Sequence, residues 1–70
     1  MRRSHVDSSN LQSVGYDPIN QILEVEFRSG DIYVYYGVPE VVYRELMAAQ
    51  SHGRFFSAQI RLNYRYEKVR

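Results

Sequence analysis

The amino-acid sequence predicts a small α+β domain. It has an antiparallel three-stranded sheet, one main helix packed on the sheet, a short second helix and an extended C-terminal segment. Three observations predict this class. Residues 22 to 28 alternate apolar and polar side chains, which is typical of a half-buried strand. Residues 38 to 49 carry apolar side chains at helical spacing. The chain has 70 residues, which suffice for one hydrophobic core.

Three strands are expected along the first half of the chain. The first covers residues 11 to 16 and ends at a turn that contains Pro18. In the second strand, Leu23, Val25 and Phe27 point to one face. A reversal at Gly30 leads into the third strand, residues 32 to 36, whose two faces are both apolar. The orientation of this third strand in the sheet therefore stays open.

The main helix is expected to begin near Pro39 and Glu40, because proline is tolerated in the first turn and glutamate complements the positive end of the helix dipole. Gly53 suits a left-handed C-terminal cap, so the helix is predicted to end near residue 51. One apolar stripe is expected to cover the sheet, and it consists of Val38, Val42, Leu46 and Ala49.

Beyond the main helix, Phe56 and Ile60 are spaced as on a short second helix, and residues 62 to 66 are expected to be extended. Residues 1 to 10 lack any apolar period, so they are predicted to form a loosely ordered N-terminal segment. Residues 11 to 70 are then a single domain. The chain has no cysteine, which excludes disulfides and thiolate zinc sites. A cytoplasmic location without a membrane partner is expected.

Charge is unevenly distributed along the chain. Residues 4 to 43 hold one basic and six acidic side chains, whereas residues 44 to 70 hold six basic and two acidic ones. The C-terminal part is therefore able to present a positive face to phosphates. The alternative is an ordinary mixed surface whose last third is rich in arginine.

The sequence does not indicate an enzyme. It offers only two histidines, His5 in the N-terminal segment and His52 near a helix end, and no cysteine nucleophile. Glu24 and Glu26 share one face of a strand, but they are explained as solvated strand residues. No phosphate-binding loop or dinucleotide motif occurs. Catalytic residues, metal sites and cofactors are therefore not expected.

Aromatic content is the unusual feature, with seven tyrosines and three phenylalanines. The pattern Tyr-x-Tyr occurs at residues 33 to 35 and again at residues 64 to 66, where Arg65 lies between the two rings. Tyrosine rings can stack on unpaired bases while arginines bind phosphates. The alternative is that the rings fill a core too small to close without them.

A set of short motifs, in this order, resembles the KTSC domain family. The motifs are Ser8-Ser9-Asn10-Leu11, Val14-Gly15-Tyr16-Asp17, Leu23-x-Val25-x-Phe27, Gly30, Tyr33-x-Tyr35, Val38-Pro39, Ala49-x-Ser51-x-Gly53-x-x-Phe56 and Ile60-Arg61. The resemblance covers about residues 6 to 68. The family is named after a C-terminal extension of some lysyl-tRNA synthetases and also occurs alone in small bacterial and phage proteins. It has no firmly assigned activity, and its attachment to a tRNA enzyme implies nucleic-acid binding.

These observations lead to one main hypothesis and two alternatives. The main hypothesis is a non-enzymatic accessory module that contacts RNA, tRNA-like RNA included, through Arg54, Arg61, Tyr64, Arg65 and Lys68. The first alternative is a protein-interaction or homodimerising module that uses the apolar face formed by Ile32, Val34 and Tyr36. The second alternative, ranked last, is the capture of a small nucleotide between such subunits.

Overall fold

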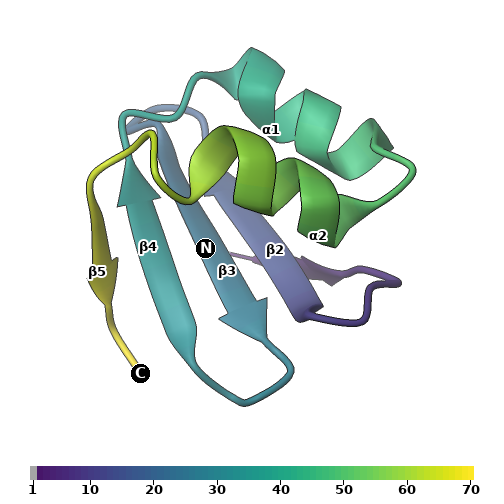
Figure 1. Cartoon of the computed structure of the whole chain (residues 1–70). Helices are drawn as coiled ribbons and strands as arrows, with labels where there is room; N and C mark the ends of the chain where they lie inside the picture. Colours follow the sequence, from purple (N-terminus) through teal and green to yellow (C-terminus); the bar gives the residue numbers. More distant parts are fainter. Residues whose placement is uncertain (1) are drawn as a thin grey trace.

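The computed structural model describes residues 2–70 as a five-stranded antiparallel sheet with helices on one face (Figure 1). The strands lie in the order of the sequence: β1 (Arg3–His5), β2 (Leu11–Asp17), β3 (Ile22–Phe27), β4 (Ile32–Tyr36) and β5 (Tyr66–Lys68). Between β4 and β5 the chain forms α1 (Glu40–Ala48), α2 (His52–Phe55) and the π-helical turn η1 (Phe56–Ile60), which continues α2. We call the face without helices the open face.

The α+β class agrees with the sequence prediction, but the prediction of three strands is wrong. Strand β1 adds to β2 at one edge, and β5 adds to β4 at the other. Both are only three residues long, so local apolar alternation does not reveal them. They form because their backbone groups pair with strands β2 and β4. The Tyr36 N–H donates to the Arg65 carbonyl at 2.8 Å, and the Ile32 N–H donates to the Arg70 carbonyl at 2.7 Å, on either side of β5.

The sequence predicts a loosely ordered segment over residues 1 to 10, but residues 3 to 5 form the edge strand β1. Arg3 lies opposite Gly15 in the register of β1 and β2. Just after β1, the Val6 N–H donates to the Gln12 carbonyl at 3.2 Å, and the Val6 side chain is buried in the core. This buried valine anchors β1 to the sheet, because leaving its side chain in water is unfavourable.

The register of the central strands fixes which side chains face the helices. Leu23 lies opposite Tyr35, and Val25 lies opposite Tyr33. Leu23 and Val25 are fully buried under the helices, so Tyr33 and Tyr35 point to the same side. The ambiguity over the third predicted strand is thereby resolved. The open face of β4 carries Ile32, Val34 and Tyr36.

The predicted apolar stripe of the main helix is the one that meets the sheet. Val38 and Leu46 are fully buried, and Val42 packs against the core. The helix ends at Ala48, earlier than predicted, and Gly53 lies inside α2 rather than at a left-handed cap. A left-handed backbone that favours glycine occurs instead at Gly30, whose φ of +97° turns the β3–β4 hairpin, and at Gly37, whose φ is +72°.

Phe56 and Ile60 are both buried, which confirms the short second helical face. Because η1 continues α2, the two elements together cross the upper part of the sheet (Figure 1). The ends of β3 and β4 near their connecting hairpin extend beyond this helix (Figure 1). None of the helices in residues 2–70 is both long and apolar enough to cross a membrane.

Candidate functional site

A groove of about 640 Å³ opens beside the β3–β4 hairpin, on the side of the sheet that bears the helices. One wall is formed by α2, η1 and the turn that follows, and a second by residues 9 to 11, where the chain enters β2. Its floor is aromatic and brings together side chains that are far apart in the sequence: Phe27, Tyr33, Tyr35, Phe56 and Tyr66. We call this hollow the aromatic groove.

The rings of the aromatic groove hold one another in place. Tyr66 lies 5.9 Å from Tyr33 and 5.7 Å from Tyr35 between ring centroids. Phe56 meets Tyr35 edge to face at 5.3 Å, and Phe27 meets Tyr33 in the same way at 5.6 Å. Such contacts stabilise aromatic clusters beyond their buried area. The rings of the floor therefore form one contiguous aromatic cluster.

The tyrosines of the groove differ in what they offer to a ligand. Tyr35 is only 3% exposed, and this burial raises the pKa of its hydroxyl to about 12. It therefore stays neutral at physiological pH. Tyr66 is 52% exposed, although it contacts Tyr33 and Tyr35. Tyr66 thus presents ring surface to solvent at the entrance of the groove.

Two arginines border the groove. The Arg28 Nε donates to the Ser8 carbonyl at 2.6 Å, and its Nη1 donates to the Gln12 side-chain oxygen at 3.2 Å. Arg61 lies close enough to Tyr35 to oppose the rise of its pKa, and it makes no ion pair within residues 2–70. Arg28 is held in position, whereas the Arg61 guanidinium remains available to an anion.

One carboxylate also lines the groove. The Asp31 Oδ1 lies 3.6 Å from the Lys68 Nζ at the edge where β5 passes the hairpin. This ion pair offsets the negative charge of Asp31, so the border of the groove keeps a positive balance. In the part of the chain that the structure describes, no three His, Asp or Glu side chains gather to hold a metal ion.

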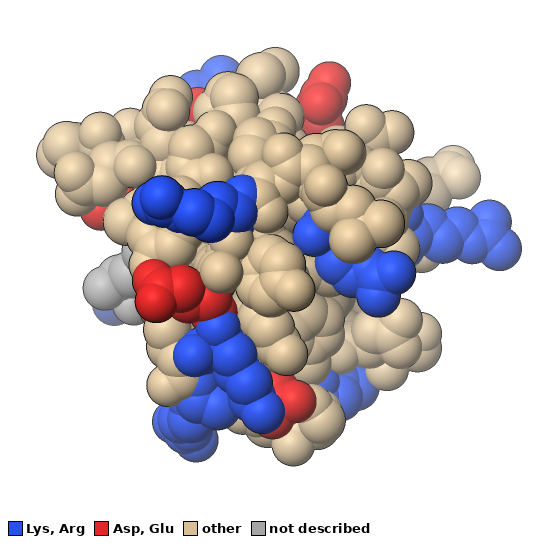
Figure 2. Space-filling view, turned by 60° about the vertical axis from the view of Figure 1, so that its left-hand side comes forward, with Lys and Arg blue, Asp and Glu red and all other residues tan. Residues whose placement is uncertain are grey.

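The structure does not bring the five residues predicted to bind RNA onto one surface. Arg61 lines the aromatic groove, Arg54 lines a hollow beside it, and Lys68 lies at its edge through Asp31. The Arg65 guanidinium instead lies over the ring of Tyr36, 4.9 Å from its centroid. Figure 2 shows basic side chains in several separate groups on this side of the molecule.

Tyr64 differs most from the expected role. It is partly buried and packs against the hydrophobic core, so its ring is not an open stacking surface. It precedes β5, whereas Tyr66 lies within that strand. The alternation that would place both rings on one face is therefore absent. The second Tyr-x-Tyr motif therefore does contain an exposed tyrosine, but it is Tyr66 rather than the predicted Tyr64.

Arg28 also lines this site, although it is not among the binding residues that the sequence predicts. It follows Phe27, and the alternation over residues 22 to 28 predicts it to lie on the polar face of that strand. The strand ends at Phe27, and the Arg28 N–H donates to the Asn10 carbonyl at 2.9 Å. This hydrogen bond holds residue 28 beside the segment that precedes β2. Because the two residues are far apart in the sequence, no local pattern predicts their contact.

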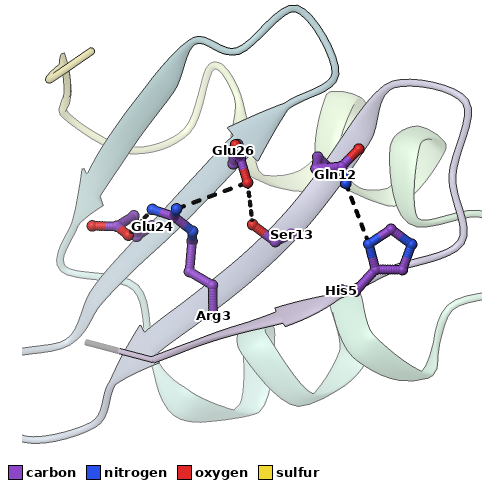
Figure 3. Close-up of polar contacts among 6 residues, drawn as sticks. All are labelled: Arg3, His5, Gln12, Ser13, Glu24 and Glu26. Atoms are coloured by element: carbon purple, nitrogen blue, oxygen red, sulfur yellow. Dashed lines mark hydrogen bonds and ion pairs between the residues drawn. The ribbon is translucent and has the colours of Figure 1, made fainter.

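The open face carries the second predicted surface. Ile32, Val34 and Tyr36 lie on this face in β4, although Ile32 is only 5% exposed. Charged residues share the face. Figure 3 shows Arg3 reaching from β1 across β2 to Glu24 and Glu26 on β3.

Other polar contacts occupy the same face. The Ser13 hydroxyl donates to Glu26 at 2.8 Å (Figure 3). The Tyr36 hydroxyl donates to Glu67, which raises the pKa of Tyr36. The open face is thus a mixture of apolar side chains and of charged groups that contact one another or a neighbouring side chain.

The comparison with known families covers most of the chain. The profile of the KTSC domain matches residues 7–64. The chain belongs to the KTSC domain family. The crystal structure of a KTSC domain protein from Yersinia pestis superposes with a TM-score of 0.96 at 42% sequence identity, covering 99% of this chain and 97% of the other. The resemblance noted in the sequence is therefore confirmed.

Two relatives show the contexts in which this KTSC domain occurs. An uncharacterized protein of Stutzerimonas stutzeri is 47% identical over 70 residues and is covered to 99% of its length. A lysine–tRNA ligase of a Nostoc species is 38% identical over 63 residues, which are 90% of this chain but 11% of the ligase. The KTSC domain is thus a small module that occurs both in proteins of its own length and as a minor part of a tRNA ligase.

Proposed function

We propose that this KTSC domain is a non-enzymatic accessory module that binds unpaired RNA, tRNA-like RNA included, in the aromatic groove. The observation that carries the proposal is that Tyr66, a tyrosine that is 52% exposed, and Arg61, an arginine without an ion-pair partner in residues 2–70, line the same groove. Unpaired bases stack on such rings, and guanidinium groups neutralise the phosphates that link them.

The shape of the site favours single strands over duplex RNA. Only an unpaired base exposes a face that can enter a groove and stack on its floor. The floor consists of uncharged aromatic side chains, while Arg28, Arg61 and Asp31 also line the groove. This arrangement matches a nucleotide, whose base is apolar on its faces and whose phosphate is anionic.

The relatives support RNA as the polyanion. A segment similar to this chain is part of a lysine–tRNA ligase, a protein named for its action on tRNA. An accessory RNA-binding module would add affinity for the nucleic acid without taking part in the reaction. The same module in a protein of its own length would act as a separate RNA-binding protein.

A salt titration of tRNA binding tests the proposal with a matched pair of variants. Arg61→Gln removes a charge at the groove, whereas Arg65→Gln removes one on the open face. We expect Arg61→Gln to weaken binding and to reduce the slope of log affinity against log salt by about 0.7 to 1, because one phosphate contact is lost. Arg65→Gln is expected to leave both unchanged.

Two outcomes would contradict the proposal. Equal losses of affinity for both variants would indicate that tRNA binding depends on the overall charge of the protein rather than on the groove. Failure of the unmodified protein to bind tRNA at low salt, at a protein concentration of about 50 µM that detects nonspecific affinities, would exclude RNA binding.

Self-association through the open face is a second candidate function. It is favoured by Val34 and Tyr36, which lie together on a face that no helix covers. It ranks second because Arg3, Glu24 and Glu26 share this face, and burying these charged side chains in an interface has a desolvation cost.

Sedimentation equilibrium tests this candidate. A homodimer would give twice the chain mass of 8.3 kDa at micromolar concentration, and Val34→Glu would return the mass to that of one chain. A mass of one chain for the unmodified protein, at every accessible concentration, would remove the candidate.

A further inference from the structure

We infer that the RNA site continues past the aromatic groove into a second hollow, which binds the sugar-phosphate of the neighbouring nucleotide. The smallest ligand that fills the site is then two linked nucleotides rather than one. This inference rests on the proposed function, because it extends the same site. It adds one binding residue, Arg54, and a minimum length for the ligand.

The two hollows form one continuous track. The second has a volume of about 560 Å³ and lies on the far side of a shared wall. Four residues line both hollows, namely Ser9, Asn10, Gly53 and Ser57. None of the four is buried and none is charged, so the two hollows adjoin at the surface, where a strand can lie across both.

The chemistry of the second hollow differs from that of the groove. Its lining contains no aromatic and no acidic side chain, and its only charged residue is Arg54. It therefore offers no stacking surface for a second base. It offers hydroxyl and amide groups together with one guanidinium, which are the groups that bind sugar and phosphate.

Arg54 is placed to take this role. Its backbone N–H donates to the Ser51 hydroxyl at 3.2 Å, which anchors the first turn of α2. Its exposed side chain makes no ion pair with any residue between 2 and 70. Arg61 in the groove and Arg54 in the second hollow thus lie on the two sides of the shared wall. Two cations placed in this way can neutralise successive phosphates of one strand.

Calorimetric titrations with uridine 5′-monophosphate and with the dinucleotide pUpU test the inference. We expect the unmodified protein to bind the dinucleotide on the order of tenfold more tightly, as one added hydrogen bond to a charged group implies. Arg54→Gln should remove most of this gain and leave the affinity for the mononucleotide unchanged. The control is Arg44→Gln, because Arg44 lies on α1 and pairs with Glu40. It should alter neither affinity.

The outcomes separate this inference from the proposed function. A dinucleotide that binds no more than about twice as tightly, the statistical effect of two equivalent bases, would overturn the second hollow while leaving groove binding intact. An equal loss for both ligands in Arg54→Gln would overturn it as well. Failure of both compounds and of tRNA to bind would overturn the inference together with the proposed function.

Discussion

Replacing Leu46 with alanine is expected to lower the free energy of unfolding by about 2 to 5 kcal/mol. Leu46 is 0% exposed and lies in the core beneath α1, together with Leu23 and Val25 of the sheet. Removing its side chain leaves a cavity in a domain of 70 residues, whose whole stability is on the order of 4 to 10 kcal/mol. Urea or thermal unfolding followed by circular dichroism measures the loss.

Val41→Ala is the matched control for this prediction. Val41 lies on the same helix but is 59% exposed, so its truncation should change stability by no more than about 0.5 kcal/mol. Similar unfolding curves for Leu46→Ala and the unmodified protein would show that α1 does not pack on the sheet by this face.

Replacing Tyr66 with alanine is expected to cost about 1 to 3 kcal/mol of binding free energy with single-stranded RNA and little with duplex RNA. The change removes the exposed ring at the entrance of the aromatic groove and leaves Tyr33 and Tyr35 in the floor. Fluorescence anisotropy with a labelled single strand and the matching duplex measures both affinities.

Tyr66→Phe separates stacking from other effects, because it keeps the ring and removes only the hydroxyl. It should bind single strands nearly as well as the unmodified protein. A loss of the same size in Tyr66→Phe and Tyr66→Ala would show that the hydroxyl rather than the ring contacts the RNA. An unchanged affinity in Tyr66→Ala would contradict the placement of a base at this ring.

The elements that sequence predicted are those whose side chains carry a strong local period. Leu23 and Val25 alternate with charged residues, and both are buried as β3 requires. Leu46 falls on the apolar stripe of α1. In each case one buried face determines both the type of element and its orientation. The pattern of apolar residues is therefore sufficient to predict β3 and α1.

The edge strands could not be predicted in this way. Strand β5 is exposed at all three residues, so no buried face marks it in the sequence. It forms because β4 offers unpaired backbone groups that the C-terminal segment satisfies. Similarly, β1 depends on the burial of Val6 just beyond it. Such pairing is a property of the assembled sheet.

The aromatic groove illustrates the same limit. The sequence predicts that a tyrosine and several C-terminal arginines contact RNA, and one of these arginines, Arg61, lines the groove. The rings of Phe27, Tyr35 and Tyr66 come together only through the sheet register and the position of η1. The choice of Tyr66 over Tyr64 depends on where β5 begins, which the repeated Tyr-x-Tyr pattern does not specify.

The most direct test of RNA binding in the aromatic groove is an NMR titration of the labelled protein with a short single-stranded RNA. We expect the backbone amides of Arg28, Gly53, Arg61 and Tyr66 to shift together as the RNA saturates the site, while those of Glu24 and Val34 on the open face stay in place. Shifts centred on the open face, or none at saturating RNA, would contradict the account.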